Sequence, residues 1–242
     1  MHVTGPSARR TVQEGARVLA GNRSRARTGW GSTAMRLTHL GHACLLVETD
    51  GARLLLDPGV LSAFDDVRDL DGVLVTHQHA DHVDPSRLGP LLAANPGARL
   101  WVDEDTVTAV PGLPDHSVAR PGDQFRIAGT TVAVIGGLHA AVYGDIPGCT
   151  NAAYLVDDGA FLHPGDSFVV PGRDADVLAV AVDGPWLKLA EAVDYVRAVR
   201  PRVAVPVHEG ETTDPGKYAG MLAAFSPEGV VRALPRAEAV TL

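Results

Sequence analysis

The chain contains few cysteines, few lysines and few aromatic side chains among its 242 residues. Its two cysteines, Cys44 and Cys149, are too far apart for a CxxC motif, and Cys44 lies within an apolar run. This scarcity argues against a disulfide-stabilised secreted domain, and we expect free thiols in a reducing cytoplasm. Long apolar runs are also missing: none approaches the roughly 20 residues that cross a bilayer, so we expect a soluble protein without a membrane segment.

Clustered positive charge is scarce outside the first residues of the chain. Lysine occurs at positions 188 and 217 alone, and the formal net charge is −8. Residues 1–34 contribute +5 to this balance, from six arginines and one glutamate, which leaves −13 on residues 35–242. Because nucleic-acid binding requires clustered lysine and arginine, we expect a small-molecule substrate and no nucleic-acid partner. A homo-oligomer is compatible with this composition.

Residues 1–34 differ in composition from the rest of the chain. They lack the roughly 7 to 15 apolar residues of a secretory signal, and we expect a basic, disordered extension. A simpler hypothesis is that Met35, directly before the strand-like sequence Arg36-Leu37-Thr38, is the true start of the folded enzyme. Residues 35–242 suffice for one domain with a large core, since 45% of the chain is hydrophobic.

Short apolar runs typical of buried strands are frequent, whereas helical periodicity is rarer. The clearest helix is predicted over residues 186–199, where one apolar stripe precedes Pro201. Two shorter helices are predicted over Pro85–Asn95 and Asp103–Val110, the first opening at a proline and the second at a capping aspartate. Strands are predicted over residues 36–39, 43–49, 53–56, 73–76, 99–102, 125–127, 131–135, 153–156, 160–162, 177–182 and 203–207.

Histidine and aspartate residues follow four of these apolar runs. The densest group is His77-Gln78-His79-Ala80-Asp81-His82, directly after the run at 72–75. His139 follows the run at 131–135, Asp166 follows the run at 159–162, and His208 ends the run at 202–207. Functional side chains at strand ends are held precisely by the sheet without burying polar groups in the core. The pattern therefore predicts a metal site.

Imidazole and carboxylate ligands suit a borderline divalent cation, with zinc as the first expectation and manganese or iron as alternatives. Adjacent side chains in the His77–His82 segment diverge and cannot easily converge on one ion. Two ions are therefore a simpler interpretation than one. We expect His77, His79 and His139 at the first ion, and Asp81, His82 and His208 at the second. Asp166 has two carboxylate oxygens with which to bridge both ions.

The His77–His82 sequence resembles the HxHxDH signature of the metallo-β-lactamase superfamily, with His139, Asp166 and His208 in that family's order. The resemblance covers residues 35–242. The segments Gly41–Glu48, Leu54–Gly59, His163–Ser167 and Val205–His208 are similar to a branch of uncharacterised metal-dependent hydrolases near L-ascorbate-6-phosphate lactonase. The resemblance implies an α/β fold, an αββα sandwich of two packed sheets with helices outside and the metals at one sheet edge.

Other polar residues have secondary roles in this interpretation. Asp57, before Pro58-Gly59, either caps a turn or, as the resemblance implies, supports the ligand loop by hydrogen bonds. His42 is expected to face the site without binding metal. The resemblance implies that Asp81 both binds the second metal and steers the proton during catalysis. The remaining histidines are expected at the surface or satisfied in the core: His2, His39, His116 and His163.

The predicted function is a metal-dependent hydrolase, in which water activated by two metal ions cleaves a small ester, lactone or phosphoester. Loops at 59–69, 140–151 and 209–218 are expected to select the substrate, and Glu209 beside His208 argues against a strongly anionic one. Two alternatives stay open. One is a non-catalytic metal-binding protein of the same fold; the other is a di-iron oxidoreductase, which would be expected to carry glutamate in place of His79.

Overall fold

A computed structural model describes residues 35–146 and 148–242 of the chain. The predictions for residues 1–34, including His2, lie outside the described residues. Thirteen strands, four α-helices and one 3₁₀ turn occur in these ranges. In chain order they are β1 (Arg36–Gly41), β2 (Cys44–Glu48), β3 (Arg53–Leu56), β4 (Gly72–Leu74), α1 (Pro85–Ala94), β5 (Arg99–Val102), α2 (Glu104–Ala109), β6 (His116–Val118), β7 (Gln124–Ile127), β8 (Thr130–Leu138), β9 (Thr150–Val156), η1 (Asp157–Gly159), β10 (Phe161–His163), β11 (Val177–Ala181), α3 (Leu189–Val199), β12 (Val203–Val207), α4 (Pro215–Phe225) and β13 (Ala239–Thr241).

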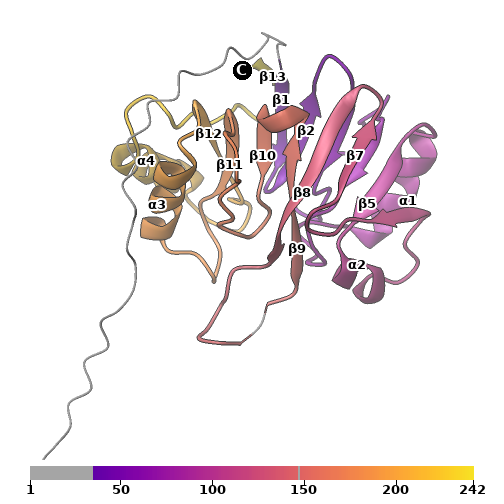
Figure 1. Cartoon of the computed structure of the whole chain (residues 1–242), viewed down its shortest axis with the longest axis horizontal. Helices are drawn as coiled ribbons and strands as arrows, with labels where there is room; N and C mark the ends of the chain where they lie inside the picture. The colour runs from indigo at the N-terminus through magenta and orange to yellow at the C-terminus, as the bar shows by residue number, and fades with distance from the viewer. Residues whose placement is uncertain (1–34, 147) are drawn as a thin grey trace, which may run out of the picture. The chain divides into compact units, whose positions relative to one another are not determined.

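The strands form two mixed sheets that lie face to face (Figure 1). The first sheet has the order β13-β1-β2-β3-β4-β5-β6, antiparallel from β13 to β3 and parallel from β3 to β6. The second has the order β12-β11-β10-β9-β8-β7, with β10, β11 and β12 parallel to one another. Strands buried on both faces explain the nearly continuous apolar runs in the sequence.

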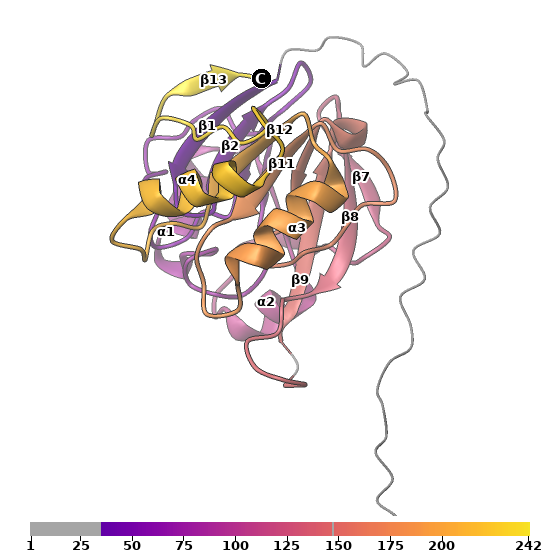
Figure 2. The same ribbon diagram turned by 90° about the vertical axis from the view of Figure 1, so that its left-hand side faces the viewer.

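A central hydrophobic core fills the space between the sheets. Leu45 and Leu54 of the first sheet belong to it, as do Tyr154 and Val205 of the second, and all four are fully buried. The outer face of the first sheet packs with α1, and the outer face of the second packs with α3 and α4. Figure 2 shows α3 and α4 lying over β11 and β12. The predicted αββα sandwich is therefore confirmed.

Helix α1 begins at Pro85, as predicted, and the Asp84 carboxylate before it also caps the helix by accepting hydrogen bonds from the backbone amides of Ser86 and Arg87. Helix α4 and the short strands β6 and β13 were not predicted. The apolar pattern of α4 is interrupted by two glycines, although Asp214 followed by Pro215 is a helix-start signal. None of the described helices is long and apolar enough to cross a membrane.

The fold brings the strand-end residues to one edge of the sandwich. Strands β8, β10 and β12 run in the same direction through the second sheet, so His139, Asp166 and His208 emerge together. The loop after β4 of the first sheet is hydrogen-bonded at this edge to β9 of the second sheet. The Tyr154 hydroxyl donates to the Val75 carbonyl at 2.8 Å, and the Ala152 amide donates to the Thr76 carbonyl at 2.8 Å.

Candidate metal centre

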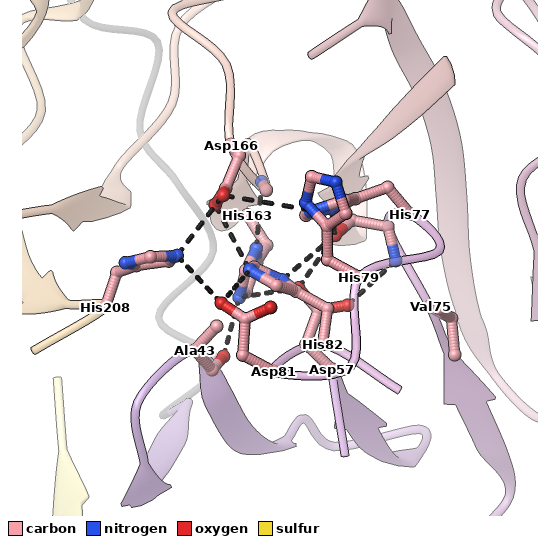
Figure 3. A network of polar contacts seen from close by, with 12 residues as sticks. Ala43, Asp57, Val75, His77, His79, Asp81, His82, His163, Asp166 and His208 are labelled. Carbon is pink, nitrogen blue, oxygen red and sulfur yellow. Dashed lines mark hydrogen bonds and ion pairs between the residues drawn. The ribbon is translucent and has the colours of Figure 1, made fainter. Parts of the chain in front are cut away.

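The predicted site residues form two adjacent clusters (Figure 3). In each cluster the potential ligand atoms all lie within 4.8 Å of one another. The His79 cluster consists of His77, His79, His139 and Asp166, and the His208 cluster consists of His42, Asp81, His82 and His208. The grouping of histidines matches the predicted assignment to two ions, with His42 added to the second group.

Asp166 belongs to the His79 cluster and also faces the His208 cluster. Its Oδ1 atom is 3.2 Å from His82 Nε2, and its Oδ2 atom is 3.2 Å from His208 Nε2 and 3.3 Å from His139 Nε2. The side chain is almost fully buried. One carboxylate therefore faces histidines of both clusters, which is the position expected of a bridging ligand.

Asp57 connects the end of β4 to the histidine loop, which is the loop of residues 77–82. One carboxylate oxygen accepts a hydrogen bond from the Thr76 amide at 2.8 Å, and the other accepts from the Thr76 hydroxyl at 2.8 Å. The same second oxygen lies 2.7 Å from His82 Nδ1. Asp57 is fully buried and has a left-handed backbone with φ of 49°. A strained conformation of this kind persists only where surrounding contacts hold it.

Gly59 allows the chain after Asp57 to approach the histidine loop closely. A Cβ atom at this position would lie 1.8 Å from the Asp81 carbonyl oxygen and 2.6 Å from the His82 amide nitrogen. The two backbone segments are also hydrogen-bonded to each other, because the Val60 amide donates to the Ala80 carbonyl at 2.8 Å. The Pro58-Gly59 turn thus has a packing role that its sequence alone does not reveal.

Hydrogen bonds orient the histidine rings of the His79 cluster. The Thr76 hydroxyl donates to Asp57, so it accepts from His77 Nδ1–H at 3.0 Å. His139 Nδ1–H donates to the Ala140 carbonyl at 2.7 Å. Both assignments place the lone pair on Nε2, on the side facing Asp166, and a fixed tautomer of this kind prepares a ring for metal binding.

Several buried polar atoms at the centre have no hydrogen-bond partner. A buried polar atom without a partner destabilises a fold, so convergence of several indicates a missing ligand. Their shared feature is that they point into the space between the clusters, where cations would accept their lone pairs. They are His82 Nε2, His139 Nε2, His208 Nε2 and Asp166 Oδ1. The donor set of imidazoles and carboxylates fits two divalent cations.

His42 uses both ring nitrogens within the protein. Its Nδ1 atom accepts a hydrogen bond from the Gly210 amide at 2.9 Å, so the proton of the neutral ring is on Nε2. That Nε2–H lies 2.9 Å from Asp81 Oδ2, to which it donates. A metal at Nε2 would require the ring to give up this proton while Nδ1 faces another donor. The geometry therefore favours contact with Asp81 over a role as ligand.

The two clusters differ in protonation in the metal-free protein. Burial, with a further contribution from neighbouring histidines, lowers the pKa of His77 and of His79 below the usual value. Burial would also lower the pKa of His208, but the carboxylates of Asp166 and Asp81, 3.2 and 3.3 Å from Nε2, favour the protonated ring and raise the pKa to about 9. The first pair is therefore neutral at pH 7, and His208 is charged.

The same balance acts on His82 and on the carboxylates. Burial opposes charge on His82, but the charges of Asp166 and Asp57 prevail and hold its pKa well above the usual value. Burial would raise the pKa of Asp81, yet hydrogen bonds with His208 and His42 lower it. The His208 cluster is thus a buried network of opposite charges, stabilised by its own ion pairs.

Two residues that contact Asp166 were missed by sequence reasoning. Trp186 donates its indole N–H to Asp166 Oδ2 at 3.0 Å, and Asn151 accepts the Asp166 amide at 3.1 Å. Trp186 follows the end of β11, so the strand-end pattern that identified the histidines would have included it. The helix predicted from residue 186 instead begins at Leu189, and this leaves the indole free to face the site.

Three histidines expected to be structural lie outside both clusters. His163 is fully satisfied in the core: its Nε2–H donates to the Ala43 carbonyl at 2.9 Å and Nδ1 accepts from Gly165. His39 is buried and contacts the His42 carbonyl at 2.9 Å. His116 is partly buried in β6 and contacts the Pro114 carbonyl.

A cleft of about 310 Å³ opens onto the clusters and is lined by His79, Asp81, His139, Asp166 and His208. Each of the three loops expected to select substrate contributes to its wall, although the third loop ends where α4 begins at Pro215. Glu209 does not line this cleft. It forms an ion pair with Arg236 beside a separate cavity of about 160 Å³, and Glu211 is the carboxylate in the cleft wall.

Comparisons with known proteins agree with this architecture. The family described as "Beta-lactamase superfamily domain" matches residues 36–208. "Protein Rv0786c" of Mycobacterium tuberculosis is 43% identical over 214 residues, covering 86% of this chain and all of that protein. A "UPF0173 metal-dependent hydrolase" of Aeropyrum pernix is 27% identical over 201 residues, covering 72% of this chain and 82% of that protein.

A solved structure shares the fold at low sequence identity. Igni18, a metallo hydrolase from the archaeon Ignicoccus hospitalis, superposes with a TM-score of 0.66 and 22% identity, covering 87% of this chain and 99% of that chain. This likeness supports the fold. The narrower resemblance to the branch near ascorbate-6-phosphate lactonase stays a prediction.

Proposed function

The chain belongs to the β-lactamase superfamily and is a metal-dependent hydrolase, and we propose that it cleaves a small ester, lactone or phosphoester with water that two divalent cations would activate. The observation that carries this proposal is the convergence of unpartnered, buried nitrogen and oxygen atoms between two clusters. The three Nε2 atoms among them lie 3.2–3.3 Å from the Asp166 carboxylate without forming hydrogen bonds, and they converge beside an open cleft.

The proposed ligand sets follow the clusters. His77, His79 and His139 would hold one ion, and Asp81, His82 and His208 would hold the other, with Asp166 shared between them. Zinc is the proposed metal because imidazole dominates both sets, and manganese or iron fits the same donors. Asp57 would orient His82, and His42 would orient Asp81, through the hydrogen bonds described above.

When bound, the two cations would supply Lewis-acid polarisation and a water molecule of lowered pKa. In ester cleavage the oxygen of water bonds to the acyl carbon, the carbon–oxygen bond to the leaving group breaks, and an acid and an alcohol result. The departing alkoxide takes up one proton. Asp81 is the proposed residue for steering this proton, because its carboxylate lines the cleft and is held in place by His42.

Two alternatives have less support. A di-iron oxidoreductase of this fold would be expected to replace His79 with glutamate, and His79 instead belongs to a histidine-rich cluster. A non-catalytic protein would be expected to lack some ligands, whereas all seven candidate ligands lie in the two clusters. The negative charge of residues 35–242 supports a small-molecule partner over nucleic acid.

Elemental analysis of the purified protein tests the proposal. We expect close to two metal ions per chain, a loss in both His79→Ala and Asp166→Ala, and hydrolysis of a generic ester or phosphodiester that falls with metal content. His116→Ala is the matched control, because His116 is a partly buried histidine outside both clusters. One ion or none, unchanged by either substitution, would contradict the proposal.

A further inference from the structure

The cleft above the clusters has an apolar wall. Val60 and Leu61 come from the loop after β3, Val142 comes from the loop after β8, and Trp186 follows β11. Val60, Leu61 and Val142 are 47%, 40% and 58% exposed. Exposed apolar side chains from separate loops that meet beside a functional site indicate a surface that a ligand covers.

Apart from its histidines, the ionisable side chains that line the cleft are acidic. They are Asp81, Asp166 and Glu211, and no lysine or arginine is among the described residues that line the cleft. Two bound cations would offset negative charge at the reacting centre alone. A second anionic group on the substrate would meet Glu211 and apolar side chains without a partner, which disfavours it.

We propose that the substrate is an ester or lactone whose acyl part is uncharged and apolar, and that this part lies against Leu61, Val142 and Trp186. The inference rests on the proposed hydrolase function for the reacting centre. It deepens that function by assigning the cleft wall as the element that selects the acyl group. Selection would be by burial of apolar surface and by exclusion of anions.

Binding of compounds that cannot be hydrolysed tests this inference separately from catalysis. The probes are a matched pair of ketones, in which a methylene group replaces the ester oxygen of para-nitrophenyl butyrate and of para-nitrophenyl hydrogen succinate. The members of the pair differ mainly by a terminal carboxylate. Titration calorimetry with the metal-loaded protein should show the uncharged ketone binding about tenfold more tightly, or better.

Two lysine substitutions locate the selecting surface. Val142→Lys adds a cation to the cleft wall and should narrow the preference for the uncharged ketone about threefold to fivefold. Val170→Lys is the matched control, because Val170 is 51% exposed and lies outside the cleft lining. It should leave the preference unchanged. Turnover of the two parent esters, followed by release of para-nitrophenolate, is measured on the same samples.

Equal or tighter binding of the anionic ketone by the wild-type protein would overturn the inference, as would equal shifts in both lysine variants. If Val142→Lys instead abolishes a dimer seen by light scattering and leaves the preference unchanged, the apolar wall belongs to self-association and the inference is wrong. Selective binding of the uncharged ketone without hydrolysis of either ester, at two ions per chain, would support the inference while refuting the proposed hydrolysis.

Discussion

The His79 cluster and the His208 cluster share the same ligand types but differ in the charge state of their histidines. In the His79 cluster the pKa of His77 and of His79 is lowered by burial. In the His208 cluster the pKa of His82 and of His208 is raised, against burial, by nearby carboxylates. The first cluster is thus ready to bind a cation at neutral pH, whereas the second must first release protons.

The difference arises from where the aspartates lie. His82 is contacted by Asp57 at 2.7 Å and by Asp166 at 3.2 Å, and His208 lies 3.3 Å from Asp81. His77 has a carboxylate of Asp166 no nearer than 3.8 Å and an imidazole at 2.9 Å. Histidines beside carboxylates gain protons, and histidines beside histidines lose them. Two metal sites built from similar residues can therefore differ in the order in which they fill.

Removing Asp57 should have the largest effect, since it abolishes one cause of the raised pKa of His82. Asp57→Ala removes the buried carboxylate that accepts from the Thr76 amide and hydroxyl and contacts His82 Nδ1, and we expect a loss of about 3–5 kcal/mol in the free energy of unfolding. The metal content should fall mainly at the His208 cluster. Denaturant unfolding and elemental analysis measure the two effects, with exposed Asp115→Ala as the control. An unchanged unfolding midpoint would show that Asp57 does not tie the loop together.

Gly59→Ala should disturb the His208 cluster more than the His79 cluster. The added Cβ would collide with the Asp81–His82 backbone, which belongs to the His208 cluster, while His77 and His79 lie earlier in the loop. We expect a destabilisation of about 1–3 kcal/mol and preferential loss of one ion. Gly89→Ala is the control, because nothing lies within 4 Å of a Cβ at this position of α1. It should be neutral or stabilise the helix by up to about 1 kcal/mol. Equal metal loss in both variants would argue against this difference.

The pH dependence of metal binding should differ between the clusters. His208 has a pKa of about 9 in the metal-free protein, so a cation at its Nε2 must displace a proton at pH 7. Affinity of the His208 cluster should therefore rise about tenfold per pH unit for each proton released, and this rise should flatten above about pH 9. Affinity of the His79 cluster should change less with pH above pH 7, because the lowered pKa of His77 and of His79 leaves both rings neutral there.

The stability of the metal-free protein depends on pH in the opposite direction: it falls as the pH rises. A histidine whose pKa is raised on folding stabilises the protein below its unfolded pKa of about 6.5, and this contribution disappears as the pH rises through about 9. Calorimetry in buffers of different ionisation enthalpy would count the protons released at each ion. Release of the same number of protons at both steps would remove the proposed difference between the clusters.

The outcome at particular residues shows what could be predicted from the sequence. Apolar runs before His139, Asp166 and His208 predicted strands from the sequence pattern alone, whereas the family resemblance implied that their ends meet at one sheet edge. Trp186 and Asn151 were missed because their roles depend on contacts with Asp166 that arise only when strands far apart in the chain become neighbours. Glu209 was placed at the metals because it follows His208. In the structure it pairs with Arg236, since the left-handed backbone of His208 turns the chain there.

The smallest expected effect concerns Cys149, which adjoins the His79 cluster. The His139 amide donates to the Cys149 carbonyl at 3.0 Å, so this thiol reports on the rigidity of that cluster. Burial, together with the charge of Asp103, raises the pKa of Cys149 to about 11, so roughly one thiol in a thousand is ionised at pH 8. Reaction with a disulfide reagent at pH 8 should be slow and should change less than about twofold on removal of metal, because the hydrogen bond between the His139 amide and the Cys149 carbonyl does not depend on an ion. Fully buried Cys44 is the slower internal reference. A large acceleration on metal removal would mean that the His79 cluster, like the His208 cluster, reorganises when its ion leaves.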